Sequence, residues 1–442
     1  MIGLRPGADR LAKARRCCPG RSGPVTRRSG AIWSADQVLE GVSDVIRAAR
    51  HRSRGFASAF AAVVAFVLVD PAVGPVRAAV CGRTDVPTLI VDGKSVPGRV
   101  WCVSPPLGAR RLHDSTPDVS AIACVSPSLC VVASDETRFA QVVQLDRVRH
   151  RIVPIRFVYL ADTPVTRNGN DRKAAPELDI EAGAAAGSRV VLAGSHGLSA
   201  KGDTLAERHG LFGFDVDEAR LEQWPVHRLR GDGERKRGDG VVAFEAAGGA
   251  KVGLVRRLLD EVEPADGGVL KAGWGQCLQD NGFNVEGLAF AGTRVLIGLR
   301  GPVADGKAFV LAADREAFLA GRVERPGVHA LPLDGLSGIR ALEPIDTGVL
   351  VLTGRSQPEP AKKGPCADFA QGSLTQSALY YWAGPEDSGT LREVARFSEK
   401  KQKPEAMTLL GADLAAGEIE LLVFFDGQPD GAPVSYRIPF AR

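Results

Sequence analysis

Polar side chains that can bind a metal ion or an anion recur at two positions of five similar segments of the sequence. The first position is the third residue of each segment, which is Ser120, Glu181, Glu286, Arg340 or Glu405. The second position follows the second apolar run of each segment, and there the residue is Asp135, His196, Arg300, Arg355 or Asp426. Such repetition predicts that residues far apart in the chain share one site.

Three kinds of chemistry are open to these residues and their neighbours. Calcium, a hard cation, prefers carboxylate and amide oxygens, and the candidate metal ligands are Asp179, Glu181, Asn284, Glu286 and Glu405. Arg300 and Arg355 can hold a phosphate or carboxylate through paired hydrogen bonds. His196 can act as a general base, so these three are the candidate catalytic residues. The residues predicted to contact a ligand are Asp135, Ser195, Arg340 and Asp426.

An alternative interpretation gives the same residues a structural role. Glutamate and arginine side chains around a narrow channel can pair with one another and lock neighbouring repeats together. The sequence contains no Gly-x-Ser-x-Gly, His-Glu-x-x-His, Walker A or dinucleotide-binding motif. Whether the protein is an enzyme therefore stays open at this point.

Each of the five segments is expected to form a β-hairpin, because two short apolar runs flank a turn. The segments are residues 118–136, 179–197, 284–302, 338–356 and 403–427. A third strand follows each hairpin, and outer strands are predicted at residues 150–160, 220–229, 328–333 and 391–398. Four strands per repeat are typical of a β-propeller blade. We therefore predict an all-β fold, with residues 80–442 forming one propeller of five four-stranded blades, or alternatively six.

The last segment is followed by only one further strand, which ends near Phe440. Its missing outer strand can come from the N-terminal side of the domain, at residues 88–93 or 98–104, which would close the ring and cover a sheet edge. Residues 231–275 interrupt the repeat and are predicted to be an inserted loop and helix, or alternatively a degenerate sixth blade. The helical spacing is carried by Val255, Leu258, Leu259 and Val262.

The polar residues are expected at one rim of the propeller. In an antiparallel hairpin the start of the first strand lies beside the end of the second, so both sets meet there. Side chains alternate along a strand, so Asp179 and Glu181 share a face, as do Asn284 and Glu286. Because the innermost strands line the central channel, the predicted ligand site is the mouth of this channel.

Residues 1–79 form a basic leader. Within it, the apolar run of residues 56–69 follows basic residues and precedes small ones, which is typical of a secretory signal peptide. The leader has 13 basic and 5 acidic residues and a net charge of +8, whereas the remaining 43 basic and 47 acidic residues give −4. We expect a bacterial periplasmic or secreted protein that does not bind nucleic acid. It would contact a membrane only through an uncleaved leader.

The cysteines agree with export to an oxidising compartment. Six follow the leader, an even number that predicts disulfides but leaves their pairing open. They are Cys81, Cys102, Cys124, Cys130, Cys277 and Cys366. Cys124 and Cys130 flank a five-residue turn in the first hairpin, so we predict a disulfide between them.

The hairpin segments DIEAGA…LAGSHG, NVEGLAF…LIGLRGP and GIRALEP…VLVLTG resemble a bacterial family of exported, propeller-like proteins of unknown function. The resemblance covers roughly residues 115–440. More distantly, the hairpins are similar to esterase-like propellers of the phytase type, and this similarity implies a calcium-dependent hydrolase. Ser120 and Arg340 depart from the acidic pattern of the other repeats.

From these observations we expect an exported, monomeric β-propeller. Its predicted role is to bind a small anionic or sugar-like ligand, or a protein, at the channel mouth. The alternative is a calcium-dependent hydrolase of phosphate or carboxyl esters.

Overall fold

The computed structural model describes most of the chain that follows the leader. The described residues are 86–107, 118–161, 163–165, 177–199, 201–218, 233–235, 242–243, 253–262, 268–333, 335–346, 348–359, 364–367, 375–386 and 390–440. The predicted leader and signal peptide, and the predicted outer strand at residues 220–229, lie outside these residues.

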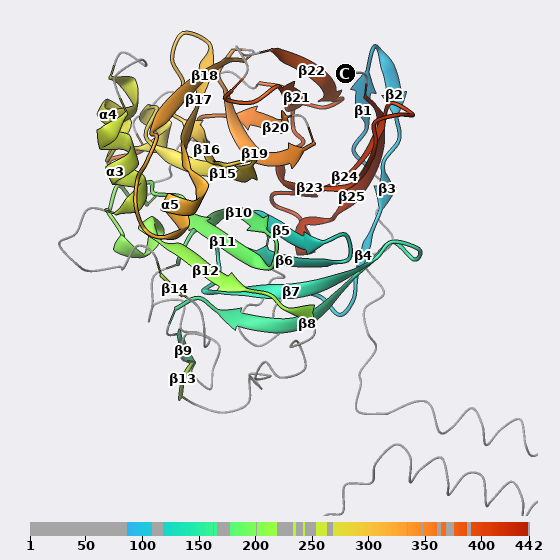
Figure 1. Ribbon diagram of the computed structural model, residues 1–442, viewed down its shortest axis with the longest axis horizontal. Coiled ribbons are helices and arrows are strands. Elements are labelled where there is room, and N and C mark those ends of the chain that lie inside the picture. Colours follow the sequence, from blue (N-terminus) through green and yellow to red (C-terminus); the bar gives the residue numbers. More distant parts are fainter. Residues whose placement is uncertain are drawn as a thin grey trace, which may run out of the picture. The chain divides into compact units, whose positions relative to one another are not determined.

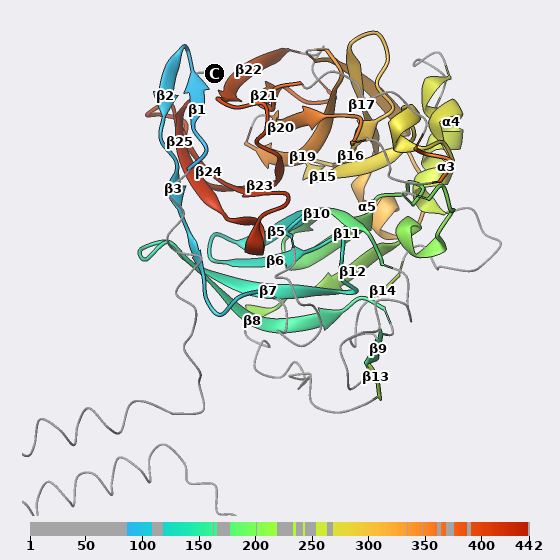
Figure 2. The ribbon, with the colours of Figure 1, turned by 180° about the vertical axis from the view of Figure 1, so that it is seen from behind.

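The described strands form a β-propeller of five blades (Figure 1 and Figure 2), and the innermost strands of the blades surround the central channel. Blade 1 consists of β5 (Ala121–Ser126), β6 (Leu129–Ala133), β7 (Phe139–Asp146) and β8 (Arg151–Tyr159). Blade 2 consists of β10 (Ile180–Ala186), β11 (Arg189–Gly194), β12 (Leu211–Asp215) and β14 (Val242–Ala243). Blade 3 consists of β15 (Asn284–Ala291), β16 (Arg294–Gly301), β17 (Lys307–Asp314) and β18 (Gly327–Pro332).

The other two blades complete the ring with help from the N-terminal strands. Blade 4 consists of β19 (Ser337–Ile345), β20 (Gly348–Arg355), β21 (Ala378–Trp382) and β22 (Leu391–Phe397). Blade 5 consists of β23 (Pro404–Asp413), β24 (Glu418–Phe425), β25 (Val434–Pro439) and β3 (Arg99–Val100). The all-β fold with five four-stranded blades is therefore confirmed, and the alternative of six blades is not what the structure shows.

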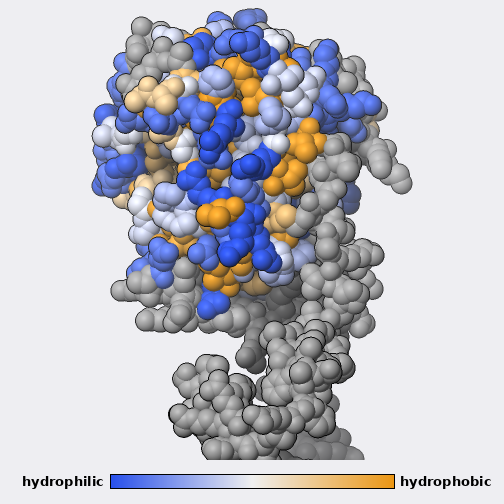
Figure 3. Space-filling model, turned by 90° about the vertical axis from the view of Figure 1, so that its right-hand side faces the viewer, coloured by the Kyte–Doolittle hydropathy of each residue, from blue (hydrophilic) through white to orange (hydrophobic). Residues whose placement is uncertain are grey.

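Both predicted N-terminal strand segments take part in closing the ring. β3 pairs with β25 through Val100 and Val434, and so supplies the missing outer strand of blade 5. β1 (Leu89–Val91) pairs with β22 of blade 4 and with β2 (Lys94–Val96), and β4 (Cys102–Val103) runs parallel to β8 of blade 1. This short stretch of chain thus joins three blades and covers their edges. Hydrophilic and hydrophobic residues are interspersed on the side of the propeller where these strands lie (Figure 3).

The segment predicted as an insertion contains the expected helix and also a strand. Helix α3 (Leu254–Glu261) buries Val255, Leu258 and Leu259, as the helical spacing predicted. The same segment supplies β14, the fourth strand of blade 2, although the outer strand was predicted at residues 220–229. The other short elements are α4 (Val269–Gly273), α5 (Arg315–Leu319), η1 (Ala206–His209), η3 (Leu278–Asp280), η4 (Pro429–Gly431), β9 (Thr163–Val165) and β13 (Gly233–Arg235).

The apolar core lies between the blades. In β16, Val295 and Ile297 pack toward blade 2, whereas Leu296 packs toward blade 4. Successive side chains of a strand point to opposite faces, and each face of a blade meets a neighbour. Consecutive apolar residues are therefore buried, each contributing about 1.5–3 kcal/mol relative to an exposed side chain.

Two disulfides join described cysteines. Cys124 and Cys130 are bonded across the first hairpin, which confirms the predicted pair. Cys277 and Cys366 form a second disulfide, a pairing that the sequence left open. Disulfides are typical of proteins from oxidising compartments outside the cytosol. Among the described residues, no helix has the length and apolar character needed to cross a membrane.

Candidate functional site

A β-bulge in each of four blades aims a charged side chain at the channel. Near the start of β10, β15, β19 and β23, the pairing with the next strand skips a residue. The skipped residues are Glu181, Glu286, Arg340 and Glu405. A bulge leaves one residue unpaired and redirects its side chain, and bulges are frequent beside functional sites. Blade 1 differs, because Ser120 precedes β5 and its Oγ donates to the Ile180 carbonyl oxygen (2.5 Å).

Charged residues of blades 3, 4 and 5 form a central ion-pair network, which we define as Glu286, Arg300, Arg340 and Glu405. Arg300 Nη1 donates to Glu286 Oε1 (2.7 Å), and Arg340 Nε lies 2.9 Å from Glu286 Oε2. The Arg340 Nη2 group also pairs with Glu405. The buried guanidinium of Arg340 thus lies between two carboxylates. This residue, predicted to contact a ligand, is already held by partners from the protein.

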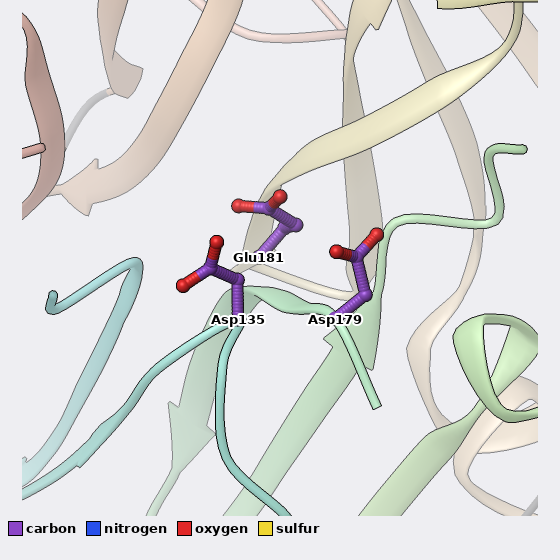
Figure 4. A group of neighbouring side chains, drawn as sticks. All are labelled: Asp135, Asp179 and Glu181. Carbon is purple, nitrogen blue, oxygen red and sulfur yellow. The ribbon is translucent and has the colours of Figure 1, made fainter. Parts of the chain in front are cut away.

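A second group, the acidic triad of Asp135, Asp179 and Glu181, lies beside this network (Figure 4). Each residue can offer one carboxylate oxygen, with all three oxygens within 4.8 Å of one another. Asp179 is held by Arg208, whose Nη1 donates to Asp179 Oδ2 (2.7 Å). Glu181, Glu286 and Glu405 can likewise each offer one carboxylate oxygen, and these three oxygens also lie within 4.8 Å of one another. Glu181 therefore connects the triad with the network.

Burial and crowding raise the pKa values of these carboxyl groups. For Glu181 the pKa lies well above its usual range, because the group is desolvated and faces the negative charges of Glu286 and Asp179. Desolvation and the charge of Asp179 likewise raise the pKa of Asp135. Burial raises the pKa of Glu405 to about 7, although Arg340 acts in the opposite direction. The channel mouth therefore holds more carboxyl groups than its arginines can pair with, and the raised pKa values favour their protonated form.

The innermost strands of all five blades, with Ser120 just before β5, line a small cavity next to these groups. Glu181 and Glu286 contribute its polar wall, and Gly183, Ala341 and Met407 contribute apolar or small surfaces. The small residues leave space within the channel that larger side chains would fill. A cation or a ligand atom at the mouth would thus contact carboxylates on one side and the channel interior on the other.

His196 lies outside the acidic triad and the network. Its Nδ1 is 2.8 Å from the Gly194 carbonyl oxygen, and its ring stacks on His209 at 5.5 Å between centroids. Trp274 packs against both rings. The side chain is 2% exposed, so the candidate general base is a packed residue of the rim.

The other predicted site residues lie at the rim beside the channel. Ser195 is buried, and its backbone N–H donates to the Asp179 carbonyl oxygen. Asn284 is also buried, and within the described part of the chain its Oδ1 has no hydrogen-bond partner. Arg355 Nη2 donates to the Pro358 carbonyl oxygen (2.9 Å).

Asp426 pairs with Lys403 (3.4 Å) near the start of blade 5. Burial of Asp118 and, to a smaller extent, the charge of Asp426 raise the pKa of Asp118 to about 6. The structure therefore brings together the metal candidates Asp179, Glu181, Glu286 and Glu405, with Asp135 and Arg300. His196, Arg355 and Asp426 have the separate partners described above.

Two charged residues of the channel were missed from the sequence. Arg208 lies in η1, outside the repeated hairpins, so no repeat position pointed to it. Glu343 accepts hydrogen bonds from the Leu409 N–H (2.9 Å) and the Thr408 hydroxyl (3.2 Å), and burial raises its pKa to about 7. Glu343 lies near the end of β19, and the corresponding positions of the neighbouring repeats carry no charged residue.

Several solved structures are similar to the described chain. The periplasmic gluconolactonase PpgL of Pseudomonas aeruginosa has 14% sequence identity and a TM-score of 0.31, over 81% of this chain and 97% of that one. A putative gluconolactonase has 11% identity and a TM-score of 0.30, over 77% and 87%. The WD40 β-propeller domain of Doa1 has 10% identity and a TM-score of 0.28, over 77% and 97%.

No curated protein sequence matches the chain. A family model does match it, and the matched residues, 277–433, cover most of blades 3, 4 and 5. This match confirms the resemblance to a family of unknown function that the hairpin motifs indicated. Over residues 277–433, the chain matches the family described as Protein of unknown function (DUF3616).

Proposed function

We propose that the protein is a ligand-binding propeller in which the acidic triad binds a divalent cation, with calcium as the first candidate. The observation that carries this proposal is the convergence of three carboxylate oxygens within 4.8 Å. Arg208 pairs with Asp179, but among the described residues no lysine or arginine forms an ion pair with Asp135 or Glu181. A divalent cation would supply the missing positive charge, and calcium prefers such oxygen ligands.

The same site supports binding of a small, oxygen-rich ligand. Calcium takes 6–8 oxygen ligands, and the three triad side chains leave coordination positions for oxygens from another molecule. A sugar-like molecule or a small carboxylate offers such oxygens. The bound cation would also offset the negative charge of the mouth, which otherwise repels an anion.

Calcium is expected to raise the melting temperature of the metal-free protein. Because a ligand stabilises the state that binds it, a calcium concentration 100 times its dissociation constant should add about 2.7 kcal/mol to the free energy of unfolding. Glu181→Gln keeps the side-chain size and removes one charge, so calcium should bind at least about tenfold more weakly, a difference of about 1.4 kcal/mol. Thermal unfolding and calorimetric titration after chelator treatment measure both effects.

Glu324→Gln is the matched control, since Glu324 is exposed, pairs with Arg322 and belongs to neither charged group. Its calcium affinity should equal that of the wild type. Calcium should also bind more weakly as the pH falls, because protons compete for carboxylates whose pKa values are raised. If calcium, magnesium and manganese all leave the melting temperature unchanged, the cation site is ruled out.

A second candidate function is a calcium-dependent hydrolase, which the protonation behaviour of Glu405 favours. Its pKa of about 7 lets this carboxyl group accept and release a proton near neutral pH, as a general base must. His196, the base expected from the sequence, is packed against His209 and Trp274. Glu405 is therefore the better-placed candidate.

If the protein is a hydrolase, Glu405→Gln should reduce kcat by about 100-fold or more. Calcium-dependent turnover of lactones and phosphate esters, followed in the wild type and the variant, measures this effect. His196→Ala should retain turnover in any remaining folded protein. If the wild type shows no turnover at saturating calcium, the hydrolase function is ruled out and only the binding function remains.

A further inference from the structure

A polar cluster on blade 3 lies away from the channel mouth. Arg294 begins β16 and Arg300 lies near its end, so about 20 Å of strand separates the cluster from the mouth, at about 3.3 Å per residue. On β18, Gly327 and His329 complete the cluster. The cluster residues Arg294, Gly327 and His329 belong to neither the acidic triad nor the central ion-pair network, so an inference about them does not rest on the proposed function.

The strand register places the members of this cluster on the face of blade 3 that meets blade 4. Leu296 and Ala312 of this face pack in one apolar cluster with Trp382 of blade 4. Arg294 is two residues from Leu296, and Gly327 pairs with Ala312, so both lie on that same face. His329 is two residues further along β18, and its ring lies 5.4 Å from that of Trp382.

Two buried nitrogen atoms of this cluster lack partners. Arg294 is only 9% exposed, and in the part of the chain that the structure describes its Nε has no hydrogen-bond partner. The same holds for Nε2 of His329. Buried polar atoms are almost always hydrogen-bonded, and leaving one unsatisfied costs about 1–3 kcal/mol. Two such atoms in one cluster therefore point to a partner that the described residues do not supply.

The absence of a side chain at Gly327 provides the space for that partner. A β-carbon built on Gly327 would lie 3.5 Å from Arg294 Nη2 and 3.7 Å from His329 Nε2. Both side chains therefore converge on the face of Gly327 that the missing side chain leaves open, and a ligand atom in contact with the Gly327 Cα would lie beside both nitrogen atoms. An arginine and a histidine that converge in this way offer N–H donors to one acceptor group.

The charges around the cluster favour an anion. Desolvation and the nearby Arg325 lower the pKa of Arg294, and desolvation and Arg294 lower the pKa of His329. Asp314 is held by an ion pair with Arg325, and the exposed Glu386 is the other acidic group that acts on the cluster. A bound anion would relieve the unfavourable burial of positive charge.

We propose that Arg294, His329 and the open position at Gly327 form a binding site for a small oxyanion, namely a phosphate or a carboxylate group. The site lies between blades 3 and 4, and Trp382 forms part of its apolar wall. Bidentate recognition by arginine is common for both kinds of group. The oxyanion belongs either to a free metabolite or to a larger molecule that presents it.

The test uses sulfate as the first probe, because its charge stays constant between pH 6 and 8, and the ionic strength is held with sodium chloride. Sulfate is expected to raise the melting temperature of the full chain in a saturable way. Gly327→Ala fills the open position with a methyl group at ordinary contact distance, so this variant should fold normally and lose the saturable response. Its remaining response measures the nonspecific effect of sulfate on protein stability.

Arg294→Met should weaken sulfate binding at least tenfold, whereas Arg322→Met is the matched control and should leave it unchanged. Arg322 is exposed and pairs with Glu324, so its loss removes the same charge elsewhere. Binding to the wild type should be tighter at pH 6 than at pH 8, since the bound anion favours protonated His329, and His329→Gln should abolish this difference. Phosphate and acetate titrations then distinguish the two classes of oxyanion.

Two results would overturn the inference. One is an identical sulfate response in the wild type, Gly327→Ala and Arg294→Met. The other is a response that appears only in Glu386→Gln, which would show that Glu386 itself occupies the position.

Discussion

Arg340→Met is expected to lower the free energy of unfolding by about 3–5 kcal/mol at neutral pH. Arg340 is buried and its guanidinium pairs with Glu286 and Glu405. A methionine of similar length keeps the packing but leaves Glu405 without this partner, and Glu286 retains only Arg300. The loss is large because Glu286 keeps a less compensated charge away from water, and Glu405 must either stay ionised without this partner or take up a proton. Urea unfolding of both proteins measures it.

The destabilisation should shrink as the pH falls. Burial raises the pKa of Glu405 to about 7, and removal of Arg340 should raise this pKa further because the arginine opposes the shift. A protonated carboxyl group needs no counter-charge, so the stability of the variant should approach that of the wild type near pH 5. The deficit is thus largest above pH 7.

The matched control is Arg149→Met, which removes an exposed arginine that pairs with Asp146. An exposed ion pair contributes about 0–1 kcal/mol, so this variant should unfold almost like the wild type. Millimolar calcium should stabilise Arg340→Met more than the wild type, because oxygens of Glu181, Glu286 and Glu405 lie within 4.8 Å of one another. A loss below about 1 kcal/mol for Arg340→Met at pH 8 would contradict the buried network.

The repeat pattern is what made the fold predictable from the sequence. Each hairpin carries apolar runs of strand length, and the repetition of such hairpins requires a closed or stacked arrangement. The closing strand could be predicted because the last repeat lacked one. The fourth strand of blade 2 could not, since Val242 and Ala243 form only two ladder pairs there, which leaves no apolar periodicity to recognise.

The site was predictable only where the repeat itself carried the signal. In four of the five segments the third residue reaches the channel because a bulge displaces it, and the residue types alone do not reveal a bulge. Of the second set, Asp135 and Arg300 reach the charged groups, whereas His196, Arg355 and Asp426 do not, because side chains at strand ends follow the local loop and not the repeat. His196 has a positive φ of 59° and packs beside His209, a residue of another loop. Arg208 was missed because it lies in η1, outside the repeated hairpins.

Removal of the Cys277–Cys366 disulfide is expected to lower the free energy of unfolding by about 4–5 kcal/mol. The bond joins cysteines 89 residues apart, so it restricts a long stretch of the unfolded chain. It also ties a loop that follows β20 of blade 4 to the loop that precedes β15 of blade 3. Gly202 of blade 2 lies against Pro365, beside the same bond. The disulfide therefore holds loops of three blades together at the rim.

The Cys124–Cys130 disulfide provides the internal comparison. It closes a loop of only six residues, for which the same chain-entropy argument gives about 2 kcal/mol. In two separate double variants, each pair of cysteines is replaced by alanine. Their free energies of unfolding in urea should differ by roughly 2 kcal/mol, and the variant that lacks Cys277–Cys366 should be the less stable. Full reduction of the wild type should lower the free energy of unfolding by more than either double variant does, because it opens both of these bonds together. Equal stability of the two double variants would mean that the rim loops are held by their other contacts, such as the hydrogen bond from Gln279 to Glu359, and not by the long-range disulfide.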